Sequence, residues 1–180
     1  MDHPDASWLL LIYTVPSEPS RKRASVWRDL KKLGAVYLRD GVAVLPHREE
    51  TVAAFRAVAA KIAEFGGQAT LVENARLDPD RAAAIVAEAS AGRTAEYEEI
   101  GREGEGFLAH IARERDHREF TFAEVEELEA DLLKLKRWAE QVRARDHFGS
   151  PAAGPVAAAL ERGEAALGAF LDETFAEAGE

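Results

Sequence analysis

The sequence predicts an α+β fold, with a sheet-containing domain over residues 1–76 and an antiparallel α-helical region over residues 77–180. A continuous apolar run at Trp8–Val15 is typical of a buried central strand. Two short strand-like runs flank Asp40-Gly41, a dipeptide that favours a tight hairpin turn. After Asn74 the apolar residues follow a helical period almost to the C-terminus. These three observations predict strands and helices in the N-terminal part of the chain and helices alone in the C-terminal part.

The first strand, Trp8–Val15, is expected to end at Pro16 and to lead into a helix over Arg21–Leu33. Ser20 is the expected N-cap of this helix, and Gly34 is the expected C-terminal stop. The apolar residues of the helix recur at helical spacing and should pack on the sheet. They are Ala24, Val26, Trp27, Leu30 and Leu33.

A hairpin of Ala35–Arg39 and Val42–Leu45 follows, then a second helix over Arg48–Phe65 and a fourth strand over Gln68–Glu73. The resulting β-α-β-β-α-β order is the ferredoxin-like pattern, a helix-covered antiparallel sheet with one face left open. We expect the core to form around the first strand. Its predicted members are Trp27, Leu30, Tyr37 or Val36, Val44, Phe55 and Ile62.

The helical region begins at Asp78-Pro79-Asp80, where a capping residue precedes a proline. The glycine-containing stretch Gly101–Gly106 is expected to bend or interrupt it. Thr121 and Glu124 form a capping box that starts a helix running to about Arg145. After a break at Gly149-Ser150-Pro151, a last helix is expected from about Pro155 to Phe175.

The charge of the chain is unevenly distributed. Residues 1–47 contain seven Lys and Arg against five Asp and Glu, a net charge of +2, whereas the whole chain carries −10. The acidic total argues against wholesale wrapping of nucleic acid but leaves room for a local basic contact. The run Trp8–Val15 is too short to cross a membrane and nothing resembles a signal peptide, so we expect a cytoplasmic protein without a membrane partner.

The basic stretch at the start of the first helix is the main candidate site. Helix N-termini offer free N–H groups and a positive dipole end, and arginine side chains bind tetrahedral oxyanions and phosphates. A surface helix with solvated charges explains the same pattern. A second basic set lies on a later helix, where ordinary ion pairing is the stronger explanation. The candidate anion- or DNA-binding residues are Ser17, Ser20, Arg21, Lys22, Arg23 and Arg28, with Lys134 and Arg137 in the second set.

No catalytic or metal site is predicted. His110, Glu114 and His117 fall at helical spacing, but a carboxylate-bridged bundle site needs a second E-x-x-H motif and further carboxylates. The chain has no cysteine, and it shows neither a glycine-rich phosphate loop nor a hydrolase motif. We therefore expect no cofactor and no enzyme activity. Trp27 and Trp138 lie on apolar stripes and are expected in the core rather than as base-stacking residues.

Two segments resemble a known family, the N-terminal domain of the chromate-resistance regulator ChrB. The first is LLLIYTVPSEPSRKRASVWRDLKKLGAVYLRDGVAVLP. The second starts at FTFAE, has K-x-x-R-W at its centre and ends in R-A-R-D-x-F-G. The resemblance covers about residues 7–175 and extends distantly to the ferredoxin-like domain of PaaX-type repressors and of small CRISPR-associated adaptor nucleases.

The resemblance implies a transcriptional regulator of chromate resistance, with operator DNA as partner and chromate or a similar oxyanion as effector. Longer members continue into a C-terminal domain, so a separate chain carrying that domain is a possible partner. The adaptor nucleases place an Asp at the end of the first strand, where this chain has Thr14-Val15-Pro16-Ser17, which disfavours a metal-dependent nuclease. The remaining alternative is a dimerisation or protein-interaction module with no direct ligand. Exposed sheet edges make a homodimer possible.

Overall fold

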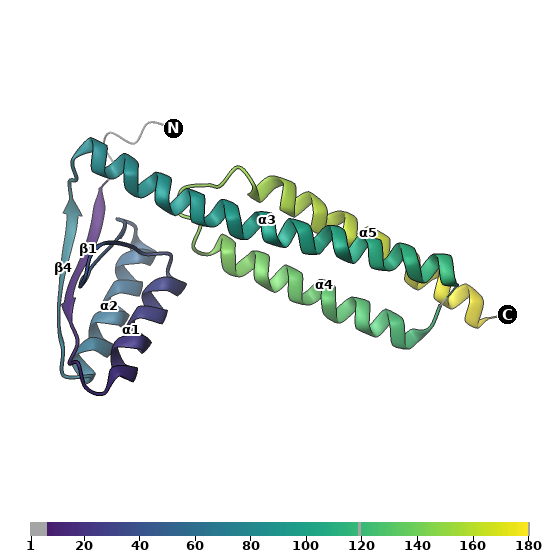
Figure 1. Cartoon of the computed structure of the whole chain (residues 1–180), viewed down its shortest axis with the longest axis horizontal. Coiled ribbons are helices and arrows are strands. Elements are labelled where there is room, and N and C mark those ends of the chain that lie inside the picture. The colour runs from purple at the N-terminus through teal and green to yellow at the C-terminus, as the bar shows by residue number, and fades with distance from the viewer. Residues whose placement is uncertain (1–6, 119, 180) are drawn as a thin grey trace. The chain divides into compact units, whose positions relative to one another are not determined.

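The structure of the chain, a computed structural model, describes residues 7–118 and 120–179. Its first half has the predicted β-α-β-β-α-β order (Figure 1). The four strands form one antiparallel sheet in the order β2-β3-β1-β4, so β1 is central, as its apolar sequence predicts. The elements are β1 (Trp8–Thr14), α1 (Ser20–Lys32), β2 (Val36–Arg39), β3 (Val42–Pro46), α2 (Glu49–Glu64) and β4 (Gln68–Ala75).

The main core lies between α1, α2 and one face of the sheet. Phe55 and Ile62 of α2 and Leu30 of α1 are fully buried there, as predicted. Tyr37 is partly buried in the same core, whereas Val36 and Val44 are buried on the opposite face of the sheet. The prediction for Trp27 is wrong, because its side chain is 51% exposed. Val26, its neighbour in the sequence, takes the buried position instead.

The opposite face of the sheet is covered at one end, in contrast to the predicted open face. Ile85, from the first turns of α3 (Pro79–His117), is buried against Trp8, Val36 and Val44. Ile12, on the same strand as Trp8, remains 44% exposed. Because side chains alternate along a strand, Trp8 and Ile12 share one face. This face is therefore covered near Trp8 and open near Ile12.

The helical half consists of α3, α4 (Phe122–Arg143) and α5 (Ala153–Ala178). The predicted interruption at Gly101–Gly106 is wrong, since α3 is continuous through it. This stretch of α3 packs on α5: a Cβ at Gly101 or Gly104 would lie 3.8 Å from an α5 side chain, which is an ordinary van der Waals distance. Such packing stabilises a long helix despite the low helix propensity of glycine. The predicted cap of α4 is confirmed, because the Thr121 hydroxyl accepts a hydrogen bond from the Glu124 amide.

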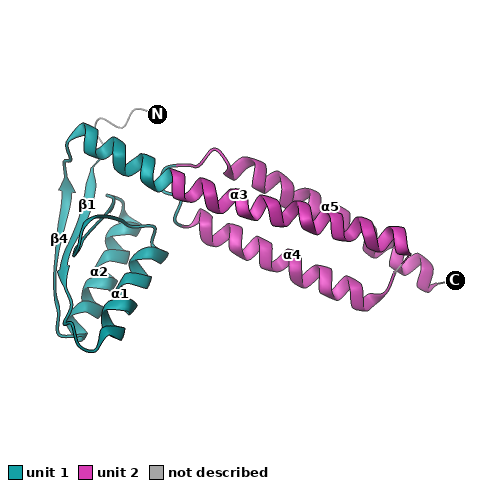
Figure 2. Cartoon of the chain, in the orientation of Figure 1, with its two compact units in different colours: residues 1–90, 145–148 teal, residues 91–144, 149–180 magenta. Residues whose placement is uncertain are grey.

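The chain forms two compact units, which differ from the predicted ranges 1–76 and 77–180 (Figure 2). Unit 1 comprises residues 1–90 and 145–148, and unit 2 comprises residues 91–144 and 149–180. The first turns of α3 thus belong to unit 1. None of the helices within the described parts of the chain combines the length and apolar character of a membrane span.

The segment Arg145–Phe148 follows α4 and packs within unit 1. The His147 Nε2 atom donates a hydrogen bond to the Leu33 carbonyl at 2.7 Å, and Arg48 donates one to the His147 carbonyl at 2.9 Å. The Phe148 ring lies 6.0 Å from the Trp8 ring. The central residues 145–148 of the R-A-R-D-x-F-G motif, which ends the second family-like segment, are therefore part of the packing of the sheet unit.

Candidate nucleic-acid interface

α1 buries one side and presents a cationic side to solvent. Val26 and Leu30 are fully buried in the core, which leaves the outer side of the helix exposed. Exposed cations surround an exposed tryptophan on this side. We refer to this surface as the basic face; its residues are Arg21, Arg23, Trp27, Arg28, Lys31 and Lys32.

Trp27 is the aromatic residue of the basic face and, like Lys31 and Lys32, it is absent from the predicted site residues. Arg23 and Lys31 lie one turn before and one turn after it, so the three side chains line up along the helix. The Lys31 Nζ atom lies 5.5 Å from the centre of the indole ring, within the range of a cation–π contact. Half-exposed aromatic rings among cations are typical of surfaces that bind nucleic-acid bases and phosphates. The signal available in the sequence was the four-residue spacing of Arg23, Trp27 and Lys31.

The arginines of the basic face are not neutralised by acidic neighbours. Within the part of the chain that the structure describes, Arg21, Arg23 and Arg28 form no ion pair, and no acidic residue lies in the first turn of α1. Asp29, the acidic residue within the helix, contacts Lys61 of α2 at 2.5 Å. The Asp29 charge is therefore balanced by the neighbouring helix, which leaves the outer face with a positive potential.

Arg56, on α2, differs from the arginines of the basic face because it pairs with a carboxylate of the protein. Its Nη2 atom donates a hydrogen bond to the Glu73 carboxylate at 3.0 Å, and His47 lies on the other oxygen of that carboxylate at 3.5 Å. The hydrogen bond from Arg56 is the main cause that lowers the pKa of Glu73, and the hydrogen bond from His47 lowers it further. Arg56 already has an anionic partner within the protein and is a weaker candidate for an external anion.

The other predicted residues of the first site lie at the edge of the basic face. The predicted N-cap role of Ser20 is wrong, because Ser20 is the first helical residue and Pro19 occupies the cap position without a side-chain cap. Lys22 donates a hydrogen bond to the Phe65 carbonyl at 3.0 Å, so its ammonium group is directed at the end of α2. Ser17 is exposed in the loop before α1. A ligand role for Ser17, Ser20 or Lys22 stays a prediction.

The second predicted set is mixed in charge. Lys134 and Arg137 are exposed on α4, in unit 2. Arg137 lines a groove between α4 and α5, together with the carboxylates of Glu140, Glu161 and Glu164. Acidic side chains are thus interleaved with the basic ones, unlike on the outer side of α1. The structure favours the basic face of α1 over this set as an anion-binding surface.

The chain is similar to the family described as protein ChrB, N-terminal, whose model matches residues 23–180. It is also similar to protein ChrB of Cupriavidus metallidurans, with 46% identity over 44 residues. That alignment covers 24% of this chain and 14% of the relative, so the matched region is a small part of the relative's length. No solved structure matches the chain.

Proposed function

Because this chain belongs to the ChrB N-terminal family, we propose that it is a cytoplasmic regulator of chromate resistance that contacts operator DNA through the basic face of α1. The observation that carries the proposal is the set of unpaired arginines around the exposed Trp27. From Arg21 to Lys32 the helix rises roughly 16 Å. Duplex DNA carries one negative charge per about 1.7 Å of helix axis, so the basic face can lie against several phosphates.

The proposed effector is chromate or a similar tetrahedral oxyanion. Guanidinium groups donate paired hydrogen bonds to such anions as they do to phosphate, so the basic face suits both ligands. Competition between oxyanion and DNA for the same arginines would release the chain from its operator. The proposal includes no catalytic step.

The DNA contact is tested by removing three of the arginines together, Arg21→Ala, Arg23→Ala and Arg28→Ala. We expect weaker binding to the DNA upstream of the gene that encodes the chain, measured by fluorescence anisotropy at several salt concentrations. Each phosphate contact contributes about 0.9 to the slope of log affinity against log salt, so the slope should fall by up to about 2.7. Because these side chains are exposed and unpaired, the free energy of unfolding should change little.

A matched control removes the same charge elsewhere, with Arg76→Ala, Arg102→Ala and Arg113→Ala. These arginines are also exposed and form no ion pair within the described residues. The control should retain the wild-type slope, since only the net charge has changed. An equal loss in both variants would show that net charge, rather than the basic face, controls binding. Cleavage of the DNA in the presence of Mg²⁺ would contradict a non-enzymatic regulator.

A protein-interaction module is the second candidate, favoured by the groove between α4 and α5. Leu133 lines this groove and is 48% exposed, and Leu160 lies beside it. If the groove binds a second copy of the chain, light scattering at high micromolar concentration should give the mass of a dimer. Leu133→Asp should then give the monomer mass, because a desolvated carboxylate is costly. A monomer mass for the wild type would remove this candidate.

A further inference from the structure

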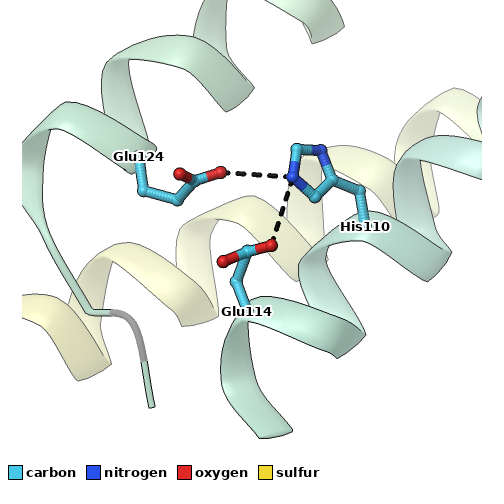
Figure 3. A group of neighbouring side chains, drawn as sticks. All are labelled: His110, Glu114 and Glu124. Atoms are coloured by element: carbon cyan, nitrogen blue, oxygen red, sulfur yellow. Dashed lines mark ion pairs between the residues drawn. The ribbon is translucent and has the colours of Figure 1, made fainter. Parts of the chain in front are cut away.

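Two helices of unit 2 bring one imidazole and two carboxylates together. His110 and Glu114 lie one turn apart on α3, and Glu124 lies in the first turn of α4. The His110 Nε2 atom is 3.3 Å from Glu114 Oε1 and 3.3 Å from Glu124 Oε1 (Figure 3). We propose that these three side chains bind a divalent transition-metal ion of the Zn²⁺ class.

The directions of the side chains favour this site. Figure 3 shows both carboxylates directed at the same ring nitrogen of His110. That nitrogen carries at most one hydrogen, which can be well aligned with only one of the two oxygens at a time. Both distances also exceed the about 2.7–2.9 Å of a charge-assisted N–H···O hydrogen bond. The arrangement is therefore a poor ion pair, although all three groups converge.

The distances match those between ligands of one metal ion. Bonds of about 2.1 Å place adjacent ligand atoms about 3.4 Å apart around a tetrahedral ion and about 3.0 Å apart around an octahedral one. The two distances from His110 Nε2 fall in this range, and all three ligand atoms lie within 4.8 Å of one another. A single ion between them thus requires only small side-chain movements.

The environment and charge of the cluster favour a cation. The side chains of His110, Glu114 and Glu124 are 26%, 12% and 19% exposed, and the Glu124 oxygen that faces the imidazole is buried from solvent. Burial of ionised carboxylates is costly unless a cation compensates them. A divalent ion bound by a neutral imidazole and two carboxylates gives a neutral site. One nitrogen and two oxygens, without thiolate, suit Zn²⁺ and neighbouring first-row ions.

The local structure holds the ligands in place. Glu124 follows the capped start of α4, where the Thr121 hydroxyl accepts a hydrogen bond from the Glu124 amide at 3.2 Å. Phe120, just before this cap, packs its ring 5.4 Å from Phe170 of α5. On α3, the four-residue spacing of His110 and Glu114 places both side chains on one side of the helix. A bound ion would therefore link the end of α3 to the start of α4.

The test is titration of the metal-free full chain with Zn²⁺ by isothermal calorimetry. The wild type should bind one ion per chain at this cluster. The double variant Glu114→Gln and Glu124→Gln should bind at least about tenfold more weakly, since even outer-shell changes cost about that much. The matched control, Glu103→Gln and Glu127→Gln, removes two exposed carboxylates from the same helices and should bind as the wild type does.

A measurement on the wild type keeps the test decisive if the double variant does not fold. Zn²⁺ should shift the ¹⁵N resonance of the His110 Nε2 atom, because direct coordination changes the electronic state of that nitrogen. If the wild type does not bind Zn²⁺ at concentrations on the order of 10⁻⁴ M, the proposal is overturned. Binding that leaves the His110 resonance unchanged would also overturn it, because the ion would then occupy another site.

Discussion

Phe55→Ala is expected to lower the free energy of unfolding by about 3–5 kcal/mol. The Phe55 ring is fully buried between α1, α2 and the sheet, where Leu9, Leu11 and Leu30 are also fully buried. Truncation removes the transfer free energy of the ring and leaves a cavity that rigid strands and helices cannot fill. Urea denaturation followed by tryptophan fluorescence measures this loss, because the indole of Trp8 is buried in the same unit.

Trp27→Ala is the matched control for this prediction. Trp27 is also a large aromatic residue of unit 1, but it is 51% exposed. Its truncation should cost less than about 1 kcal/mol, since exposed side chains contribute little to stability. A larger loss of unfolding free energy for Trp27→Ala than for Phe55→Ala would show that α1 turns the basic face, with Trp27, toward the core. The comparison therefore checks the orientation of the basic face as well as the core.

Gly34→Ala is expected to cost about 2–5 kcal/mol, from the sum of two effects. Gly34 ends α1 with a φ of +73°, a left-handed conformation that costs an alanine about 1–2 kcal/mol. In addition, a Cβ at Gly34 would lie 2.7 Å from the Arg145 carbonyl oxygen and 2.8 Å from the Arg145 Cβ. Such overlap must displace the segment Arg145–Phe148, which adds about 1–3 kcal/mol to the loss of unfolding free energy.

Gly66→Ala separates the two effects. Gly66 ends α2 in the same way, with a φ of +81° and an amide hydrogen bond back into the helix, as at Gly34. The nearest neighbour of a Cβ at Gly66 would be the Pro16 side chain, at 4.0 Å, so only the backbone cost applies there. Denaturation should give a larger loss for Gly34→Ala than for Gly66→Ala. Equal losses would mean that Arg145 does not pack against Gly34.

Much of the fold could be predicted because its signals are local. The strand Trp8–Thr14, the Asp40-Gly41 turn and the Thr121 cap each depend on residues close together in the sequence. The interruption predicted at Gly101–Gly106 failed for a tertiary reason. Gly101 and Gly104 lie against α5, and the packing of α3 on α5 compensates for the low helix propensity of glycine.

The binding role of the basic stretch stays a prediction, and the sequence did not reveal which side chains of α1 are exposed. The basic stretch is visible in the sequence, yet the apolar residues of α1 form a stripe too wide to be buried completely. Val26 and Trp27 are adjacent, so they differ by about 100° around the helix and only one can face the core centre. Packing selects Val26 and leaves Trp27 among the cations. The contact between Lys22 and Phe65 likewise depends on how α1 and α2 meet.

The metal-binding proposal shows a further limit of sequence patterns. His110 and Glu114 were recognised by their helical spacing, but Glu124 lies on the next helix and has no fixed spacing to them. His117, which the spacing also suggested, is exposed on α3. Only the path of the chain between α3 and α4 decides which carboxylate completes the cluster.

The return of Arg145–Phe148 to unit 1 has a consequence for biosynthesis. A nascent chain can form the sheet, α1 and α2 early, but Phe148 is not yet available to pack beside Trp8. Residues 91–144 must be translated first, which takes roughly 3–10 seconds at about 5–20 residues per second. During this interval the Trp8 side of the sheet lacks part of its cover. The N-terminal unit is therefore completed late in translation, and in a chain that stops before residue 145 the Trp8 ring lacks its Phe148 neighbour.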